Sequence, residues 1–581
     1  MLRCKSASVF SILLICHFAC ARAADLALEF RHFWKEKPLV FDEWIERDGG
    51  EKLSITRLAY LVSLPGLEET TGEKIEQKNW FGFIDVQEKQ NRLVLNGLPP
   101  RSFSALEFSV GLDAATNHAD PNRYAPTHAL SPVLNKLHWS WQGSYIFMAI
   151  EGRWRGADGK ETGFSYHLGN DPMLMAVRVP LALDGKKAAT FAVDFHLDRV
   201  LGDSKSVPID EQVSTHGREG DDLAVVLKRR VESAFSATEI AAPKIDAVKS
   251  GAAPLIVGTP YRFTMPATFP MPNLPVDFPM TDERVELGRR LFNEKALSRN
   301  GSTNCASCHS DAAFSDARRF SVGLDGGKTP RHGMPLVNLA WKTKFFWDGR
   351  APTLREQALV PIQDVVEMHE TLPGVTAKLS AMSDYPPSFE AAFGDPMITP
   401  ERIGVAIEQF VLSLTSFDSR FDRAMKGDGT LSEQEKRGFE LFFTEYEPRL
   451  QQFGADCFHC HGGAFFTDHG FHNNGIDPKD GDVGFGKVSG RAGDAGKFST
   501  PSLRNVAATA PYMHDGRFAT LEEVVDHYAS GIYPSATLDP NLAKHAGGIP
   551  LKPEDKAALI AFLKTLTDPR FEKQSSAPSL R

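Results

Sequence analysis

The sequence contains the same five-residue motif twice, Cys-x-x-Cys-His, at residues 305–309 and 457–461. This spacing attaches c-type haem covalently, because both cysteines form thioethers and the histidine becomes the proximal iron ligand. A zinc site or a redox-active Cys-x-x-Cys is the alternative, but neither needs the trailing histidine that both copies carry. The motifs therefore predict two haem c groups, attached through Cys305, Cys308 and His309 and through Cys457, Cys460 and His461.

Residues 1–23 have the pattern of a cleaved secretory signal peptide, with Arg3 and Lys5 before an apolar run and a small-residue cleavage site at 21–23. Three of the seven cysteines fall in this segment, so the four that remain are those of the haem motifs. No other run is long and apolar enough to span a membrane. We expect a protein of the bacterial periplasm, and its net charge of −9 argues against a nucleic-acid partner.

The apolar pattern of the first part of the chain has a period of two. It is clear in residues 106–112 and 191–197, and clusters of Gly, Asn, Asp and Pro separate such segments. This alternation is typical of half-buried strands, and it predicts an antiparallel β-sandwich over residues 24–235. The Pro- and Ala-rich segment 236–280 then predicts a linker, or a strap that lies on the next domain.

After residue 281 the pattern becomes helical. The pair 399–400, Thr-Pro, is typical of a helix start, and segments 432–435 and 520–523 match the capping box Ser/Thr-x-x-Glu. Each haem motif lies in its own helical module. The predicted architecture is multidomain, an N-terminal all-β sandwich followed by two all-α cytochrome c-type haem domains at 281–428 and 429–570, with a tail at 571–581.

Ordered motifs surround both haem sites. They are Leu287-Gly288-Arg289-Arg290-Leu291-Phe292, Phe346-Trp347-Asp348-Gly349-Arg350, Phe466-Thr467-Asp468, Phe471-His472-Asn473, Thr500-Pro501-Ser502-Leu503-Arg504-Asn505 and Tyr512-Met513-His514-Asp515-Gly516. In this order they resemble the bacterial dihaem cytochrome c peroxidases, over about residues 281–568. The resemblance implies an enzyme that carries two haem c groups and reacts with hydrogen peroxide.

The resemblance also implies an axial ligand for the second haem on a C-terminal helix. Peroxidases of the family place a Met there, whereas the methylamine-utilisation enzyme MauG places a Tyr, and Tyr528 matches that position. A phenolate oxygen donates more electron density than a thioether and favours the more oxidised iron. His527 and Met513 are the competing ligands, and ordinary helix packing of Tyr528 is the alternative.

The first haem is expected to keep an open face for peroxide. Classical peroxidases of the family often close it with a His in the following loop, but residues 323–328 contain none, and the next is His332. Trp347 matches the aromatic residue that the family places between the haems. The residues that match the distal pocket are Gln357, Pro361 and Glu367. Glu367 would be the acid–base group that moves a peroxide proton from one oxygen to the other.

Calcium between the haems is a further implication of the resemblance. Family members bind it through two carbonyls and an Asn; Thr509 and Pro511 match the carbonyl positions, but His332 occupies that of the Asn. Because imidazole is a poor ligand for a hard cation, the sequence leaves calcium binding open.

The N-terminal third carries a second set of motifs. They are Gly111-Leu112-Asp113, Asn117-His118-Ala119-Asp120-Pro121, Leu137-His138-Trp139-Ser140-Trp141-Gln142-Gly143-Ser144-Tyr145, Tyr166-His167-Leu168-Gly169 and segment 214–220. They resemble the copper-binding β-sandwich proteins of methanobactin operons, MbnP, over about residues 26–228. In that setting a separate MauG-like enzyme oxidises a tryptophan of the β protein to kynurenine, so this chain resembles the two partners fused.

Imidazoles together with a kynurenine nitrogen form an N-rich site that suits copper. The copper candidates are His118, His128, His138, His167 and His216, each of which is individually more often a structural polar residue. The candidates for the oxidised tryptophan are Trp34, Trp44, Trp80, Trp139 and Trp141, of which the last two also look like structural residues of the family.

The predicted function is an exported dihaem enzyme that uses hydrogen peroxide to oxidise a Trp of its own, or of a partner's, copper-binding domain. The enzymatic alternative is a peroxidase that removes peroxide with electrons from a periplasmic cytochrome c or cupredoxin. A non-enzymatic alternative is a copper-binding or electron-transfer protein with both haems six-coordinate. Tyr528 and the missing loop His favour modification over detoxification, and Glu367 argues against pure electron transfer.

Overall fold

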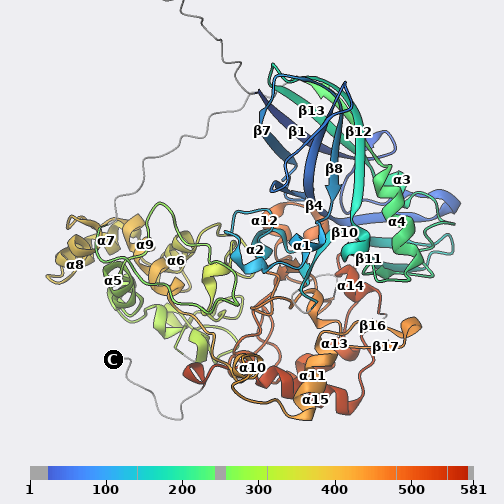
Figure 1. Cartoon of the computed structure of the whole chain (residues 1–581). Helices are drawn as coiled ribbons and strands as arrows, with labels where there is room; N and C mark the ends of the chain where they lie inside the picture. Colours follow the sequence, from blue (N-terminus) through green and yellow to red (C-terminus); the bar gives the residue numbers. More distant parts are fainter. Residues whose placement is uncertain are drawn as a thin grey trace, which may run out of the picture.

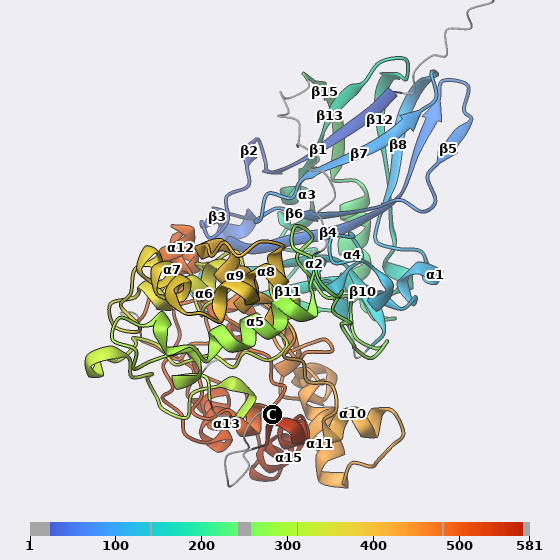
Figure 2. The same ribbon diagram turned by 90° about the vertical axis from the view of Figure 1, so that its left-hand side faces the viewer.

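The computed structural model describes residues 24–139, 142–241, 257–310, 312–478, 481–545 and 547–572. The predicted signal peptide, Trp141, the middle of the predicted linker and most of the predicted tail lie outside the described residues. Figures 1 and 2 show the β-rich N-terminal part at one end of the molecule and the helical remainder at the other. The predicted fold class, a β-sandwich followed by helical haem domains, is confirmed.

Two sheets form the β-sandwich. The smaller has the order β15-β13-β1-β2, with β7 also paired to β1, and its strands are β1 (Ala24–Trp34), β2 (Lys37–Pro38), β7 (Arg92–Leu98), β13 (Ala189–His196) and β15 (Phe235–Ile240). The larger has the order β12-β8-β4-β10-β11-β14. Its strands are β3 (Ile45–Glu46), β4 (Lys52–Glu69), β5 (Lys74–Glu76), β6 (Phe81–Asp85), β8 (Ser102–Val110), β9 (His138–Trp139), β10 (Ser144–Arg155), β11 (Glu161–Gly169), β12 (Met175–Asp184) and β14 (Ser214–Thr215).

The alternation in the sequence places one face of each strand in the core. The buried positions include Leu106, Phe108 and Val110 on β8 and Phe191, Val193 and Phe195 on β13. The expectation of a purely antiparallel sandwich is wrong, because β1 pairs with β13 and β11 with β14 in parallel. These partners come from distant parts of the chain, and no hairpin sets their direction. The sandwich also carries four short helices, α1 (Ala114–Asn117), α2 (Pro132–Asn135), α3 (Leu197–Leu201) and α4 (Asp222–Glu232).

The two haem domains repeat one packing scheme. The first contains α5 (Asp282–Phe292), α6 (Leu354–Gln363), α7 (Leu372–Ala381), α8 (Tyr385–Phe393) and α9 (Pro400–Leu412). The second contains α10 (Arg420–Met425), α11 (Glu433–Phe442), α12 (Gly486–Ser489), α13 (Leu521–Ser530), α14 (Pro540–Ala543), α15 (Pro553–Lys564) and the short strands β16 (Tyr446–Glu447), β17 (Gln452–Phe453), β18 (Phe471–His472) and β19 (Phe498–Ser499). The predicted caps at Thr399, Ser432 and Thr520 all begin helices.

A glycine allows the central helix crossing in each haem domain. A Cβ at Gly288 of α5 would lie 1.8 Å from the Ala406 carbonyl of α9, and one at Gly438 of α11 would lie 2.0 Å from the Ala558 carbonyl of α15. Only a residue without a side chain permits such close backbone approach. The equivalent crossings support the interpretation that the two haem domains are copies of one unit.

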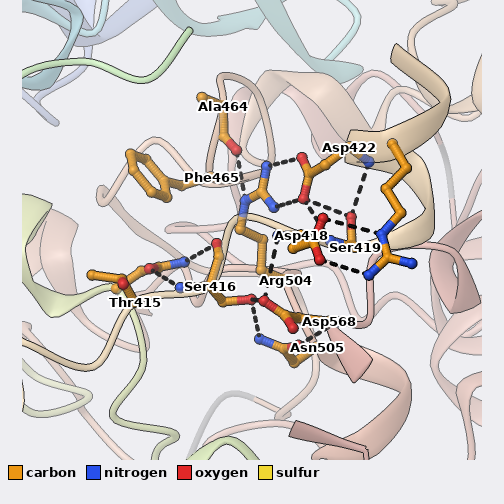
Figure 3. A network of polar contacts seen from close by, with 12 residues as sticks. Thr415, Ser416, Asp418, Ser419, Asp422, Ala464, Phe465, Arg504, Asn505 and Asp568 are labelled. Atoms are coloured by element: carbon orange, nitrogen blue, oxygen red, sulfur yellow. Dashed lines mark hydrogen bonds and ion pairs between the residues drawn. The ribbon is translucent and has the colours of Figure 1, made fainter. Parts of the chain in front are cut away.

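A buried polar network holds the segment that follows α9, together with α10, against the second haem domain (Figure 3). Arg504 makes two bonds to Asp422, at 2.8 and 2.9 Å, and a third to the Ala464 carbonyl at 2.8 Å. The next residue, Asn505, donates to Ser416 at 3.1 Å. These bonds fix the segment after α9 against the loops around the second haem motif.

The predicted linker is partly structured. Strand β15 extends the sandwich to Ile240, because the apolar alternation continues past residue 235. Beyond the undescribed part, the chain lies on the first haem domain as a strap: Trp341 donates to the Pro270 carbonyl at 2.7 Å, and Asn273 donates to the Ala340 carbonyl at 2.8 Å. Among the described residues, no helix has the length and apolar character that a membrane crossing requires.

The β-sandwich packs directly on the second haem domain. In Figure 1, α14 lies beside β10 and β11. The contact is close, since a Cβ at Gly163 of β11 would lie 2.1 Å from the Pro540 carbonyl of α14. Arg153 of β10 also donates to the Ser535 carbonyl at 2.7 Å. This interface brings β11 and its histidine to the second haem motif.

Candidate active site

Both haem motifs present their histidine in the same way. The motif cysteines begin short 3₁₀ turns, Cys305–Ser307 and Cys457–His459. The Nδ1 of His309 donates to the Phe314 carbonyl at 2.9 Å, and the Nδ1 of His461 donates to the Phe466 carbonyl at 3.0 Å. Because Nδ1 carries the proton, Nε2 is the nitrogen left to bind iron. The donor set fits a proximal haem ligand in both domains.

A pocket adjoins the first motif, and Cys305, Cys308 and His309 line it. Its apolar walls include Phe292, Leu354, Ile407 and Val411. Thioether-forming cysteines, a proximal imidazole and apolar walls together fit a haem group.

The predicted distal residues line the same pocket. Gln357 and Pro361 come from α6, and Glu367 follows that helix. Burial raises the pKa of Glu367 to about 7, and the nearby Asp364 adds to the effect. A carboxyl group that titrates near neutrality can both accept and return a proton. The acid–base role of Glu367 stays a prediction, and its burial in this pocket agrees with that role.

Among the described residues that line this pocket, His309 is the only histidine. His332, the first histidine after the predicted open loop, is held elsewhere: its backbone N–H donates to the His514 carbonyl at 2.8 Å, and its Nδ1 donates to the Arg318 carbonyl at 3.1 Å. The arrangement agrees with an open distal face, which stays a prediction.

Trp347 lies between the haem domains. Its indole is buried and donates to the His332 carbonyl at 2.8 Å, while its own carbonyl accepts from Ser499 of the second domain at 2.8 Å. Trp347 thus contacts both haem-binding units, and its place between the two haems stays a prediction.

Three candidate ligands for the second haem lie near Asn474. The Asn474 amide donates to the Tyr528 hydroxyl at 3.3 Å and approaches the Met513 sulfur at 3.5 Å. His527 instead uses Nε2 to bond the Asn474 carbonyl at 3.0 Å. Burial raises the pKa of Tyr528 to about 12, with nearby Cys460 a further cause. Tyr528 and Met513 therefore both stay candidates, and His527 is occupied.

The calcium candidates do not form a suitable donor set. Thr509 is buried, and Pro511 follows a cis peptide bond. His332 takes the place of an oxygen ligand, and imidazole does not suit a hard cation. No step below depends on calcium.

Of the five copper candidates in the β-sandwich, the structure brings two together. His118 is exposed, and its Nε2 lies 3.1 Å from an Asp171 carboxylate oxygen. The ring of His128 stacks on that of Tyr124, with ring centroids 4.5 Å apart. His138 packs edge-on against Tyr145 at 4.7 Å between ring centroids, and burial lowers its pKa to about 4. Only His167 of β11 and His216, which follows β14, lie close to one another, with ring centroids 5.5 Å apart.

The tryptophan candidates differ in their surroundings. Trp139 is buried, and its ring lies 5.4 Å from that of His216. The other described indoles have different partners: Trp34 donates to the Glu46 carbonyl, Trp44 lies under Arg155, Trp80 donates to the Val94 carbonyl, and Trp154, which was not among the predicted candidates, donates to Glu51. Trp139 is therefore the described candidate in ring contact with a copper-candidate histidine.

Sequence analysis missed His459, which lies between the two cysteines of the second haem motif. Its ring is 5.8 Å from that of His216 and 5.9 Å from that of His167. Burial lowers the pKa of His459 to about 3, with the charge of Lys544 as the next cause. The signal was visible, since Cys-Phe-His-Cys-His contains one histidine more than haem attachment requires. The motif alone does not show that the β-sandwich packs against His459.

Comparison with known proteins agrees with both halves of this architecture. The family profile of di-haem cytochrome c peroxidases matches residues 282–430, and the MbnP profile matches residues 23–217. The chain is 37% identical over 310 residues to the methylamine utilization protein MauG of Methylorubrum extorquens, with 52% of the chain and 83% of MauG covered. It is 30% identical over 323 residues to cytochrome c551 peroxidase of Nitrosomonas europaea, with 54% and 90% covered.

A solved structure is also similar. The crystal structure of a MauG-like protein associated with microbial copper homeostasis is 38% identical, and the match covers 54% of this chain and 99% of that one, with a TM-score of 0.48. The relatives' names, MauG and cytochrome c peroxidase, are those of dihaem oxidoreductases. The chain therefore belongs to the family of MauG and the di-haem cytochrome c peroxidases, with an MbnP domain fused ahead of its two haem domains.

Proposed function

We propose that this enzyme uses hydrogen peroxide to oxidise Trp139 of its own MbnP domain to kynurenine. One observation carries the proposal: the rings of Trp139, His216 and His459 form a continuous series, with centroids 5.4 and 5.8 Å apart. His459 lies within the second haem motif. The fusion therefore places a buried tryptophan two ring contacts from a haem attachment site.

The reaction balances with peroxide as the sole oxidant. Two molecules of hydrogen peroxide oxidise the indole, whose C2–C3 bond breaks as each carbon gains an oxygen atom, and two molecules of water are released. One molecule of water then hydrolyses the formyl group, leaving the kynurenine aniline and formic acid. The tryptophan loses four electrons, and each peroxide accepts two. When bound, the haems supply the redox chemistry that links these two half-reactions.

Different residues of the chain have separate roles in the proposed reaction. Glu367 takes the proton from one peroxide oxygen and returns it to the other, and the half-buried Gln357 orients the peroxide in the same pocket. Trp347 provides an aromatic contact between the haem domains. Tyr528 supplies a hard oxygen donor at the second site. Because Trp139 is buried at some remove from the peroxide pocket, it is oxidised through the protein and not by direct contact with peroxide.

The proposed setting is the bacterial periplasm, where haem c attachment and a cleaved signal peptide place such enzymes. Copper is the proposed metal partner of the MbnP domain. Imidazoles and an aniline nitrogen are borderline donors that suit copper, so oxidation of Trp139 would add a ligand to the histidine cluster. A periplasmic cytochrome c or cupredoxin would serve as electron partner if the enzyme instead removes peroxide.

The stoichiometry tests the proposal. Protein matured with both haems should consume two peroxides and release one formate for each kynurenine formed. The variant Trp139→Phe should release no formate, whereas Trp34→Phe, which removes another buried indole of the same domain, should behave as the parent. Formate release that is equal in Trp139→Phe and the parent would refute the assignment.

A further inference from the structure

Three imidazoles from two domains meet beside the second haem motif. His167 and His216 come from the β-sandwich, and His459 comes from the haem domain. One ring nitrogen of each lies within 4.8 Å of one ring nitrogen of both others. This spacing is short enough for a single ion to be bound by all three.

The nitrogens that could bind an ion are buried and make no hydrogen bond. Within the described part of the chain, this holds for His167 Nδ1, His216 Nε2 and His459 Nε2, and the last lies 3.8 Å from a Glu445 carboxylate oxygen, beyond hydrogen-bond distance. The side chains are 4%, 5% and 3% exposed, respectively. A buried polar atom without a partner costs free energy, and three such atoms aimed at one place point to a bound ion.

Carboxylates hold two of the rings in the orientation that a metal site requires. Glu151 contacts His167 Nε2 at 2.9 Å, and Glu445 contacts His216 Nδ1 at 3.1 Å. A metal-binding histidine usually donates its other N–H to a carboxylate, which fixes the tautomer and the ring plane. The nitrogen opposite each carboxylate is the one that lacks a partner.

Each carboxylate is itself neutralised. Arg57 contacts Glu151 at 2.9 Å, and Lys544 contacts Glu445 at 3.2 Å. Both carboxylates are therefore engaged as supports of the imidazoles, and the ligands that remain are imidazole nitrogens.

Another possible ligand group nearby is already occupied. It comprises Cys460, His472 and Asp539. Cys460 is expected to form a haem thioether. His472 is bound between Asp539 at 2.6 Å and Asp468 at 2.8 Å, so both of its nitrogens have partners.

The second alternative group shares His459 and adds Glu445 and Asp456. Asp456 accepts a bond from His545 at 2.7 Å, and Glu445 already has two partners, so neither carboxylate is free. The three imidazoles are thus the group whose donor atoms are available.

We propose that His167, His216 and His459 form a copper site that bridges the MbnP domain and the second haem domain. Neutral imidazoles favour copper among the first-row divalent metals, and three nitrogen donors leave one position open beside Trp139. The site rests on the proposed copper partner of the MbnP domain, but it does not require Trp139 to be oxidised. It makes the haem motif itself a source of a ligand to a second metal.

The bridging position has two consequences. A bound ion links the β-sandwich to the second haem domain, because His167 and His216 come from the sandwich and His459 comes from the haem domain. Without His459, all of the remaining ligands belong to the sandwich. The ion also lies next to the second haem, since His459 is flanked in sequence by Cys457 and Cys460. Copper binding should therefore alter the absorption and electron paramagnetic resonance signals of the second haem and leave those of the first unchanged.

The experiment is a competition titration of the copper-free, diferric full-length protein with cupric ion and a chelator of cupric ion. His459→Ala should weaken copper binding by at least about 100-fold, and Glu445→Gln, which keeps all three imidazoles, by about 10- to 100-fold. His128→Ala is the matched control and should bind as the parent. Trp139→Phe should still show the His459-dependent binding, which separates this site from the oxidation reaction.

Intact mass and haem absorption would verify that each variant carries both haems, and Glu445→Gln provides the test if His459→Ala fails to mature. Copper binding by His459→Ala with the affinity of the parent would overturn the bridging site. A loss in His138→Ala as large as that in His459→Ala would place the site elsewhere in the β-sandwich. Zinc binding tighter than copper binding would overturn the choice of metal.

Discussion

The imidazole rings of His216 and His459 lie 5.8 Å apart, although His216 belongs to the β-sandwich and His459 to the second haem motif. Trp139 continues the series on the sandwich side, with its ring 5.4 Å from that of His216. Under the proposed function, a tryptophan that would otherwise depend on a chance encounter with its oxidising enzyme is held at the enzyme by a buried interface.

Replacing Glu367 by Gln should slow the reaction with peroxide by about 100-fold without affecting haem attachment, because the amide cannot accept the peroxide proton. The pKa of Glu367 is raised by burial to about 7, so in the parent kcat/KM for peroxide should rise with pH through about 7 as the carboxylate forms. Stopped-flow absorption measures both effects. A variant that retains the parent rate and the same pH profile would exclude Glu367 as the base.

Replacing Trp347 by Phe should leave the first reaction with peroxide largely intact and reduce the yield of kynurenine. The change removes the bond to the His332 carbonyl and the indole between the haem domains. Trp34→Phe is the matched control, because it also removes a buried indole that donates to a carbonyl, at 3.1 Å, but one that belongs to the β-sandwich. Equal yields in the two variants would contradict a role in charge transfer.

The resting protein with both irons ferric should give one high-spin and one low-spin electron paramagnetic resonance signal. The first iron lacks a sixth ligand in this account, and Tyr528 supplies one to the second. Tyr528→Phe should change the low-spin signal only. His527→Gln should leave it unaltered, since His527 is bound to the Asn474 carbonyl. A resting spectrum with low-spin signals alone would contradict an open first haem.

Asp422→Asn should lower the free energy of unfolding by about 3–5 kcal/mol, because it leaves Arg504 buried with an uncompensated charge. Asp418→Asn, which disrupts an exposed pair with Arg423, should cost under about 1 kcal/mol. Chemical denaturation compares the two variants. Similar losses in the free energy of unfolding would show that the network in Figure 3 does not stabilise the fold more than an exposed ion pair does.

The same ion pair predicts a dependence of stability on pH. Burial opposes ionisation of Asp422, but its bonds to Arg504 lower its pKa. The carboxylate therefore stabilises the folded protein above its ordinary pKa of about 4, and this contribution is lost as the pH falls through the lower folded value. The parent and Asp422→Asn should converge in stability toward acid pH.

Local signals predicted most of the fold. Capping residues such as Thr399 and Ser432 act within one turn of helix, and alternation marks strands regardless of their partners. The parallel pairing of β1 with β13 depends on contacts between distant segments, which a local pattern does not encode. The extra strand β15 was visible in its alternation, but the Pro- and Ala-rich composition after it obscured it.

The candidate site was likewise predicted only in part from the sequence. The haem ligands follow from spacing, and Glu367, Trp347 and Tyr528 follow from resemblance to a family. His459 could not be assigned from the sequence, because its role depends on which surface of the β-sandwich packs against the haem motif. The choice of Trp139 among the tryptophans likewise required the structure, because the adjacent His138 packs on Tyr145 and the histidine in ring contact with Trp139 is His216, which is distant in sequence.

The most direct test is a peptide map of the dihaem full-length protein before and after addition of hydrogen peroxide, without an external reductant. The account predicts that residue 139 changes from tryptophan to kynurenine, with loss of one carbon and gain of one oxygen, while Trp34, Trp44, Trp80 and Trp154 stay intact. Replacing both Cys305 and Cys308 by Ala should abolish the change. An unmodified Trp139 in protein that consumes peroxide with an external electron donor would contradict the account and favour a detoxifying peroxidase.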